Sequence, residues 1–364
     1  MGKRLLLAGG GHGHVYVLKR LINEKMKDIE ITLVSDSQTH IYSGMIAGYL
    51  EDIYDETKVT HHLKTLCHKA GVTFIEDHIT KVDHHKKIVT GRHGDYPYDF
   101  LGMDLGSAGR QNPNFSSHLI HYVKPAKQII KLKEKVSKHH YPTIAIVGGG
   151  ASGMEIAFAL RQTSPSSKIL LFNREEKAIT NFNIHSQTTA LQQLGKRKIQ
   201  YYAKTSIDKI EEDTLYTDKG SFTANLIICA LGVTGVEVEF KGFRTDQNNF
   251  IQANSQLFIA DQALALGDMI YIDKFPFITK AGVYAVHASP IYYHNLMNLV
   301  QSHNHFRHFD PPKDYLAILN TGGRTAILNH RNISHYGRIP FEIKNFIDQN
   351  FMQRKFKWRK ETII

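Results

Sequence analysis

Several features that define whole classes of protein are scarce or absent in this sequence. Cys67 and Cys229 are the only cysteines among 364 residues, and neither belongs to a closely spaced pair. A disulfide framework is therefore not expected, and both thiols are predicted to be small buried side chains. No apolar run approaches the roughly 18 residues that a membrane span needs. The apolar stretch after Lys3 and Arg4 is also too short for a signal peptide. We therefore expect a cytoplasmic protein.

Acidic side chains are fewer than basic ones, at 34 against 45, which gives a formal net charge of +11. Such a balance favours anionic partners, whether nucleic acid, a membrane surface or a phosphate-bearing cofactor. The motifs described below favour the cofactor, and we expect no nucleic-acid partner. Histidine is abundant, with 22 copies, but no Cys/His spacing is typical of a zinc site. We predict no metal site.

The hexapeptide GGGHGH at 9–14 lies between an apolar run of strand length at 4–8 and a helical pattern at 14–27. A second strand-like run, 29–36, ends in Ser35 and Asp36. A dinucleotide-binding unit requires this order. Glycines let the backbone approach a pyrophosphate, the helix N-terminus supplies N–H groups, and an acceptor after the second strand holds a ribose hydroxyl. His14 stands where the third glycine of G-x-G-x-x-G belongs, so this copy is incomplete.

A second glycine loop is complete. The strand-like run 143–147 leads into Gly148, Gly150 and Gly153, and a strong helical pattern and another strand-like run follow. Two such loops, each between a strand and a helix, predict two dinucleotide sites in an α/β protein. A flavin and a nicotinamide dinucleotide are the natural pair, because hydride passes between them.

Further segments carry a family resemblance across nearly the whole chain. They are HIYSGMIAGYLEDIY, YPYDFLGMDLGSAGR, NLIICALG, LALGDMI, TKAGVYAVHASPIYYHNL and EIKNFIDQNFMQRKF. With the two loops, they resemble the two-dinucleotide-binding flavoproteins of the pyridine nucleotide-disulfide oxidoreductase superfamily. Within it, the chain is most similar to the type II NADH dehydrogenase branch, including members with a G-G-G-H-x-H-V start, some of which are fused to selenide-water dikinase.

The resemblance implies two Rossmann-like domains of the glutathione reductase-like FAD/NAD(P)-binding fold, plus a C-terminal segment. The FAD domain would comprise 1–115 and 245–325, the NAD(P)H domain 116–244, and an amphipathic basic segment 326–364. The residues expected to bind FAD are Gly9, Gly11, His12, Gly13, His14, Ser35, Asp36, Ser43, Gly44, Met45, Gly106, Ser107, Arg110, Gly267, Asp268, Ala281, Gly282 and Val283. Those expected to bind NADH or NADPH are Gly148, Gly150, Ala151, Ser152, Gly153, Asn173, Arg174, Ala230, Leu231 and Gly232.

The chain departs from the family pattern at several points. Leu105 and Leu231 replace the threonine of the two A-T-G-like strands. More importantly, the redox-active cysteine pair of disulfide reductases and of sulfide:quinone oxidoreductases is missing. The resemblance therefore implies an FAD-dependent NAD(P)H dehydrogenase that passes electrons directly from the flavin to a quinone or another acceptor. Two alternatives stay open: a soluble reductase of a protein carrier such as ferredoxin, and a non-enzymatic redox-sensing module.

The choice of nicotinamide cofactor depends on the residues after the strand-like run 168–172. Asn173 occupies the place of the acidic residue that favours NADH, and Arg174 can accommodate the 2′-phosphate of NADPH. Alternatively, Glu175 or Glu176 accepts from the 2′-hydroxyl and favours NADH. Glu155 has a family counterpart facing the nicotinamide, but it also suits a helix first turn.

Lys280 and the histidines of the first loop leave alternatives open. Lys280 either stabilises an anionic reduced flavin or points to solvent. His12 and His14 either bind pyrophosphate or flavin through their rings, or fill the space between helix and strand. A metal at these histidines is not expected, because a phosphate site would compete with a cation and no third ligand is evident.

The C-terminal tail combines an apolar stripe with basic residues. Its apolar positions fall close to one helical face: Ile343, Phe346, Ile347, Phe351 and Met352. Five bases and the single tryptophan follow them: Arg354, Lys355, Lys357, Trp358, Arg359 and Lys360. Such a segment suits the inner face of the cytoplasmic membrane, where quinones reside. The alternative is a helix packed on the protein body or on the partner of a homodimer.

Overall fold

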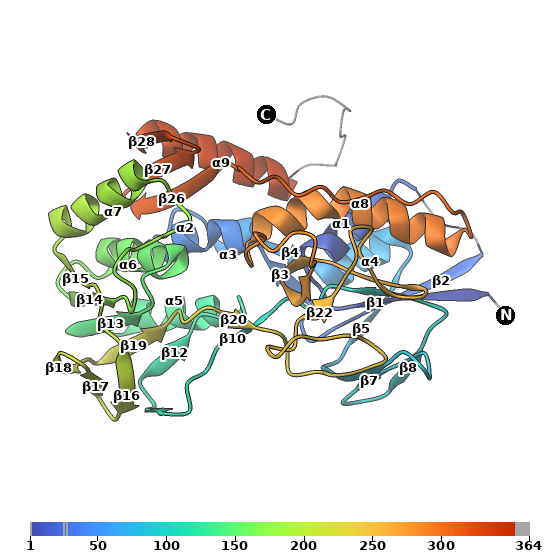
Figure 1. The fold of residues 1–364 in the computed structure, drawn as a ribbon, viewed down its shortest axis with the longest axis horizontal. Helices are drawn as coiled ribbons and strands as arrows, with labels where there is room; N and C mark the ends of the chain where they lie inside the picture. The colour runs from blue at the N-terminus through green and yellow to red at the C-terminus, as the bar shows by residue number, and fades with distance from the viewer. Residues whose placement is uncertain (1, 25, 27, 354–364) are drawn as a thin grey trace.

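Two parallel sheets form the centres of two lobes that lie side by side (Figure 1). The structure, a computed structural model, describes residues 2–353 except positions 25 and 27. Both sheets carry the strand–glycine loop–helix–strand order that the sequence predicts. The predicted α/β class with two dinucleotide-binding folds is confirmed.

The first sheet has six strands in the order β23-β24-β9-β1-β2-β5. Their bounds are β1 Lys3–Ala8, β2 Ile29–Ser35, β5 Thr73–Glu76, β9 Phe100–Met103, β23 Phe258–Ala260 and β24 Ala263–Ala265. Only the β23–β24 pairing is antiparallel. Because β1 is buried on both faces from Leu5 to Ala8, it reads as a continuous apolar run. Strands from 258–265 thus complete a sheet that begins at residue 3, while the predicted domain boundaries stay predictions.

Three helices cover this sheet: α1 His12–Leu21, α4 Leu63–Ala70 and α8 Gly282–Val300. Helix α1 ends at Leu21, whereas the sequence pattern predicted it to continue to residue 27. Helices α1 and α8 pack against each other, and their buried side chains join one hydrophobic core with β1 and β9. This packing fixes the N-termini of both helices at the same edge of the lobe.

The second sheet is fully parallel, in the order β12-β19-β13-β14-β15. Its strands are β12 Ile120–Tyr122, β13 Thr143–Val147, β14 Lys168–Phe172, β15 Ile199–Tyr202 and β19 Leu226–Cys229. The accompanying helices are α5 Gln128–Lys138, α6 Ala151–Thr163 and α7 Ile184–Lys196. The central strand β13 is flanked by β14 and β19, so the carboxyl ends of all three lie beside the second glycine loop.

Smaller sheets complete the lobes. The first lobe adds β6 Ile79–Asp83, β7 Ile88–Gly91, β8 Asp95–Pro97 and β21 Glu239–Lys241 in one sheet. The second adds β11 Phe115–Ser116, β16 Ile207–Glu211, β17 Thr214–Thr217 and β18 Gly220–Thr223. Two-stranded pairs are β3 Thr39–Ile41 with β4 Thr60–His62, β10 Ala108–Gly109 with β20 Val233–Thr234, and β22 Ile251–Gln252 with β25 Ile270–Tyr271. Short helical pieces are η1 Ser43–Met45, α2 Ile46–Leu50, α3 Glu56–Val59 and η2 Gly267–Met269.

The C-terminal part forms a three-stranded sheet and a helix that reach both lobes. They are β26 Ala317–Gly322, β27 Thr325–His330, β28 Ile333–Gly337 and α9 Arg338–Gln353. Strand β26 packs on α6, and α9 lies along the top of the molecule in Figure 1. From α9, Lys344 donates to the carbonyl oxygen of Gly44 at 2.6 Å. The Met352 carbonyl accepts from Lys19 of α1 at 3.3 Å.

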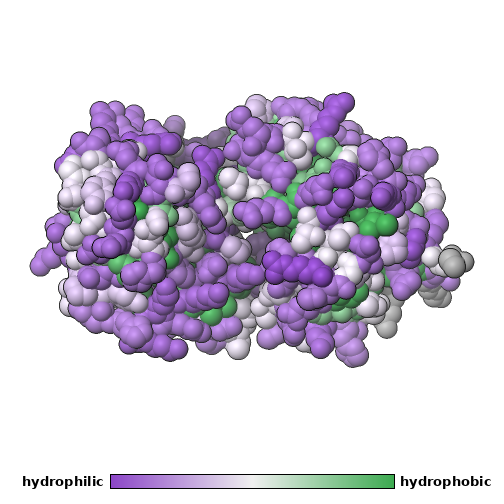
Figure 2. Space-filling model, turned by 90° about the horizontal axis from the view of Figure 1, so that it is seen from below, coloured by the Kyte–Doolittle hydropathy of each residue, from purple (hydrophilic) through white to green (hydrophobic). Residues whose placement is uncertain are grey.

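A hollow separates the two lobes when the molecule is seen from below, within a largely hydrophilic surface (Figure 2). Across residues 2–353, less positions 25 and 27, no helix combines the length and apolar composition that a membrane crossing requires. Over the same residues, no group of three or more His, Cys, Asp or Glu side chains is arranged to hold a metal ion.

Candidate dinucleotide sites

The first glycine loop connects β1 to α1 and lies against Asp104, the residue that follows β9. Gly9 adopts φ +96°, and a Cβ there would lie 2.4 Å from the carbonyl oxygen of Asp104. Helix α1 begins at His12 without a capping side chain from its own N-cap residue, Gly11. Instead, the carboxylate of Asp104 accepts the N–H groups of Gly13 and His14 at 2.7 and 3.3 Å. Asp104 therefore caps the helix from outside the loop.

The ring of His14 points into the protein rather than toward a ligand. Its Nδ1 lies 2.5 Å from the Gly9 carbonyl oxygen, and its Nε2 lies 2.9 Å from the hydroxyl of Tyr292 on α8. Burial lowers the pKa of His14 to about 4, so the ring is neutral. Both nitrogens are engaged, which corrects the expectation of a ring contact with FAD and favours the packing alternative for His14.

The ring of His12 is placed differently. Its Nε2 is buried and has no hydrogen-bond partner among the described residues. A Cβ on Gly282, at the start of α8, would lie 3.8 Å from this nitrogen and 3.5 Å from Ser43 Oγ. Burial lowers the pKa of His12 to about 4. Three predicted residues thus meet around a buried nitrogen without a partner, which fits a hydrogen-bonding ligand at this place.

Asp268 and Lys280 lie beside this group. Ser107 donates to Asp268 at 3.2 Å, and Lys124 Nζ lies 3.5 Å from the same carboxylate. Lys280 donates to the carbonyl oxygen of Ile270 and lies 3.9 Å from the centroid of the Phe250 ring. Burial lowers the pKa of Lys280. Its charge is therefore held against the protein and does not extend into solvent.

A cavity of about 380 Å³ lies beside η2 and the start of α8, with Gly267, Asp268, Lys280 and Ala281 in its lining, while the residues of the first glycine loop do not line it. Gly267, the first residue of η2, adopts φ +79°, a conformation that favours glycine. The carboxylate of Asp268 in this lining and the buried Nε2 of His12 are polar groups of the kind that hold a dinucleotide.

The second glycine loop has the same construction but a different surrounding. Gly148 adopts φ +124°, and a Cβ there would lie 2.2 Å from the carbonyl oxygen of Ala230. A Cβ on Gly153 would lie 1.9 Å from the Gly148 carbonyl oxygen. A Cβ on Gly150, in contrast, would meet no atom within 4 Å. Gly148 and Gly153 are therefore required by the fold, whereas Gly150 leaves open space for a ligand.

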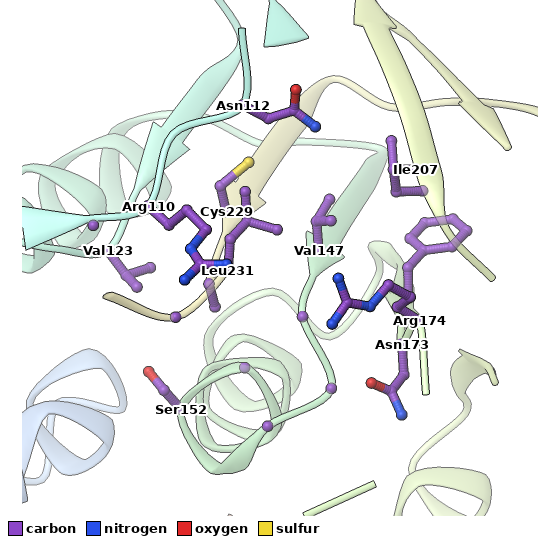
Figure 3. Close-up of a pocket in the computed structure, with 18 of the residues that line it drawn as sticks. Arg110, Asn112, Val123, Val147, Ser152, Asn173, Arg174, Ile207, Cys229 and Leu231 are labelled. Carbon is purple, nitrogen blue, oxygen red and sulfur yellow. The ribbon is translucent and has the colours of Figure 1, made fainter. Parts of the chain in front are cut away.

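A cavity of about 790 Å³ lies at this loop (Figure 3). Its lining holds every residue predicted for the nicotinamide cofactor: Gly148, Gly150, Ala151, Ser152, Gly153, Asn173, Arg174, Ala230, Leu231 and Gly232. Arg110 and Arg174 approach it from opposite sides in Figure 3. Lys124 and Lys280 also line it, against Glu175 as the only acidic lining residue. This charge distribution suits a ligand that carries phosphates.

Asn173 and Arg174 differ in their freedom to bind. The amide nitrogen of Asn173 donates to the carbonyl oxygens of Glu175 and Lys177 at 2.9 and 3.1 Å. Arg174 pairs with Glu175 at 3.0 Å, and its side chain is 77 % exposed. Asn173 therefore shapes the loop, whereas Arg174 is free to turn toward a ligand.

Four further expectations need correction or qualification. Arg110, predicted for FAD, lines the cavity of the second loop. Met45 is 1 % exposed and belongs to a hydrophobic core shared with α6. Glu155, half-buried, accepts the N–H of Asn320 on β26 at 2.8 Å and does not line either of the two cavities. Asp36 is exposed and pairs with Lys127 at 2.6 Å.

Sequence reasoning missed several residues that the fold brings to these sites. The most consequential is Asp104, an acid at the end of a four-residue apolar strand, which was visible as a departure from an A-T-G pattern. Lys124 lies in none of the quoted segments, and Tyr292 lies within the segment 279–296 but carried no predicted role. The ring of His40 lies 4.5 Å from that of His12, and Phe351 of α9 stacks on Tyr42 at 4.6 Å.

Comparisons with known proteins agree with this fold. The family model described as pyridine nucleotide-disulphide oxidoreductase matches residues 3–291. The chain is 24% identical over 241 residues to the NADH dehydrogenase-like protein YutJ of Bacillus subtilis, covering 64% of this chain and 65% of that protein. It is 22% identical over 328 residues to a type II NADH:quinone oxidoreductase of Haemophilus influenzae, covering 73% of each. The solved structure of a sulfide:quinone oxidoreductase from Aquifex aeolicus superposes with a TM-score of 0.77 at 17% identity, over 97% of this chain and 91% of that one.

Gly148, which approaches the backbone, and Gly150, which borders open space, should respond differently to substitution by alanine. Gly148→Ala forces a strained φ and a clash with the Ala230 carbonyl oxygen, and should lower the free energy of unfolding by at least about 2 kcal/mol. Gly150→Ala should leave the melting temperature unchanged and weaken NADH and NADPH binding, because its Cβ enters the cavity. Thermal melts and fluorescence titrations measure both. Equal melting temperatures for the two variants would contradict the assignment.

Proposed function

The chain belongs to the pyridine nucleotide-disulphide oxidoreductase family, and we propose that it is an FAD-dependent NAD(P)H dehydrogenase that passes electrons to a quinone. The observation that carries this proposal is the arrangement around Lys280. This one residue lines the cavity beside η2 and the start of α8 and also the cavity of the second loop. A flavin held beside the start of α8 and a nicotinamide cofactor held at the second loop would therefore meet near Lys280.

The residues that would hold FAD come from the first loop and the start of α8. The loop offers the N–H group of His12, the neutral ring of His12 offers Nε2, and Asp268 offers a carboxylate to a sugar hydroxyl. Helix α8 begins at Gly282 and directs its positive end toward the site. When bound, FAD supplies the acceptor for hydride; the protein contributes orientation and the exclusion of water.

Lys280 is a positioning charge in this proposal. Its ammonium group is tethered to the Ile270 carbonyl and enclosed by Phe250, and the carboxylates of Asp268 and Asp246 oppose the lowering of its pKa. A fixed cation between the two cavities stabilises negative charge that develops during transfer.

Electron transfer without a redox disulfide is supported by the thiols. Cys67 lies in α4 of the first lobe and Cys229 in β19 of the second, and both are buried and unpaired. Burial raises the pKa of each thiol to about 12, so neither is a reactive thiolate at neutral pH. A quinone acceptor is supported by the name of the Haemophilus influenzae relative.

Attachment to an anionic membrane is supported by α9. Four apolar side chains on this helix are between 37 % and 67 % exposed: Ile339, Ile343, Phe346 and Ile347. The predicted stripe is divided, because Phe351 and Met352 are half-buried and pack against the protein body. The bases that follow in sequence, from Arg354 to Lys360, lie outside the described residues. An apolar face followed by bases is typical of an interfacial helix.

An absorbance spectrum and anaerobic reduction test the proposed function. The purified protein should show a bound flavin that NADH or NADPH bleaches and that a soluble quinone analogue reoxidises in repeated turnovers. Turnover that needs an added acidic electron carrier would favour the ferredoxin-type reductase. A long-lived complex with negligible turnover would favour the sensor, and a protein that binds no flavin would refute the proposal.

Arg174 should select for NADPH. Arg174→Gln removes a charge-assisted partner of the 2′-phosphate and should lower kcat/KM for NADPH about tenfold while leaving kcat/KM for NADH unchanged. Arg331→Gln is a matched control, since Arg331 is another exposed arginine paired with one carboxylate. Parallel losses with both cofactors, or a large NADH advantage in the unchanged protein, would exclude this role.

The exposed face of α9 should control membrane binding. A protein with Ile343→Ser, Phe346→Ser and Ile347→Ser should float less with phosphatidylglycerol vesicles, because about 25 cal/mol per Å² of inserted apolar surface is lost. Ile184→Ser with Ile333→Ser is the control, since these residues are 58 % and 62 % exposed elsewhere. Equal flotation of both variants argues against the membrane. A dimer that the α9 variant dissociates would instead assign this face to a second copy.

A further inference from the structure

The carboxyl group of Asp104 occupies the N-terminus of α1, where an anion would otherwise bind. Asp104 follows β9 directly and is 3 % exposed. One of its oxygens accepts the N–H groups of Gly13 and His14 at 2.7 and 3.3 Å. A Cβ on Gly11 would lie 2.2 Å from the carboxyl carbon. The carboxyl group therefore fills the space that the glycine leaves against the loop.

The second lobe provides an internal comparison. Gly9 and Gly148 are the first glycines of the two loops, and their Cα atoms approach the backbone carbonyls of Asp104 and Ala230, respectively. Asp104 and Ala230 are thus equivalent positions after equivalent strands. The methyl group of Ala230 cannot accept a hydrogen bond, and the N-terminus of α6 faces an open cavity. In the first lobe, the carboxylate of Asp104 reaches the N-terminus of α1 and accepts the N–H of Gly13.

The pyrophosphate of a dinucleotide uses N–H groups of this first helical turn. The carboxylate and the pyrophosphate are both anions, and burial strengthens the repulsion between them. A negatively charged Asp104 and a bound pyrophosphate would compete for one positive helix end.

The surroundings of Asp104 do not neutralise its charge. On η2, Gly267 lies close to Asp104, since a Cβ added to it would lie 3.0 Å from an Asp104 oxygen. The negative charge of the next residue, Asp268, raises the pKa of Asp104. On α1, the ring of His14 is neutral, and on α8 the hydroxyl of Tyr292 is hydrogen-bonded to that ring. Neither residue supplies a positive charge to Asp104. Lys124 lies 3.5 Å from Asp268, and no residue in the described part of the chain forms an ion pair with Asp104. Burial and then Asp268 raise the pKa of Asp104 to about 7, while the Gly13 and His14 N–H groups lower it.

We propose that FAD binds at this helix terminus only when the Asp104 carboxyl is protonated, so that FAD binding takes up one proton from solvent. The neutral acid keeps one oxygen as acceptor for the Gly13 N–H and offers its O–H to a phosphate oxygen. The inference rests on the proposed function, because it requires FAD at the first loop. The only bond formed is the O–H bond of the Asp104 carboxyl group, and its proton comes from solvent.

Proton linkage gives the expected pH dependence. Well below pH 7, Asp104 is already protonated in the free protein, and FAD affinity is at its maximum. Above pH 7 the free protein must be protonated before FAD binds, so affinity should fall about tenfold between pH 6 and pH 8, with uptake near one proton at pH 8. Calorimetric titration of apo-protein with FAD, in buffers of different ionisation enthalpy, measures both quantities.

Asp104→Asn tests the assignment to this residue. Asparagine keeps the shape and an acceptor oxygen but cannot gain the proton, so FAD affinity should no longer depend on pH between 6 and 8 and proton uptake should vanish. Asp99→Asn is the control: Asp99 precedes the same strand and pairs with Arg4 at the surface. The Asp99→Asn protein should show the same pH dependence of FAD affinity and the same proton uptake as the unchanged protein. Thermal melts of the FAD-free variants establish that each is folded.

The outcomes separate this inference from the proposed function. FAD binding without proton uptake, or equal uptake in the unchanged protein and in Asp104→Asn, overturns the role of Asp104 and leaves the dehydrogenase proposal intact. A failure of the unchanged protein to bind FAD at any pH from 6 to 9 refutes the proposed function and this inference with it.

Discussion

The contact between the end of β9 and the first glycine loop is the constraint on which the first lobe depends. Gly9 must approach the Asp104 backbone, Gly11 must leave room for the Asp104 side chain, and the carboxylate holds the first turn of α1. Helix α1 in turn packs on α8 through the bond between His14 and Tyr292. One loop thereby fixes the relative placement of two helices whose N-termini point toward the same site.

The two lobes share one strand–loop–helix turn but differ in the groups that lie beside the helix N-terminus. Each turns a buried parallel strand into a helix through glycines that approach the neighbouring strand. In the second lobe the helix terminus faces a basic cavity through alanine and glycine, so an anionic ligand finds it open. In the first lobe an acid of the protein is already there. The fold is shared, but Asp104 stands where the second lobe has Ala230 and His14 where it has Gly153, so likeness of fold does not settle how each site binds.

The C-terminal segment connects the lobes and also exposes an apolar face. Strand β26 packs on α6 of the second lobe, while Lys344 and Phe351 of α9 contact Gly44 and Tyr42 of the first. The sequence placed five apolar residues on one helical face with a single role. The structure divides them, because Phe351 and Met352 pack against the protein body whereas Ile343, Phe346 and Ile347 are exposed.

The sequence by itself determined the two glycine loops, the parallel sheets around them and the absence of a cysteine pair, since strand burial, helix patterns and loop glycines are local features. The ten residues that it predicts for the nicotinamide cofactor all line one cavity. Only the tertiary structure decided which way His12 and His14 face, that Arg110 lines the second cavity, that Glu155 meets β26, and that Asp104 caps α1. These depend on partners up to 278 positions away along the chain, as for His14 and Tyr292. No local pattern encodes such contacts, because they arise only when the strands and helices have packed.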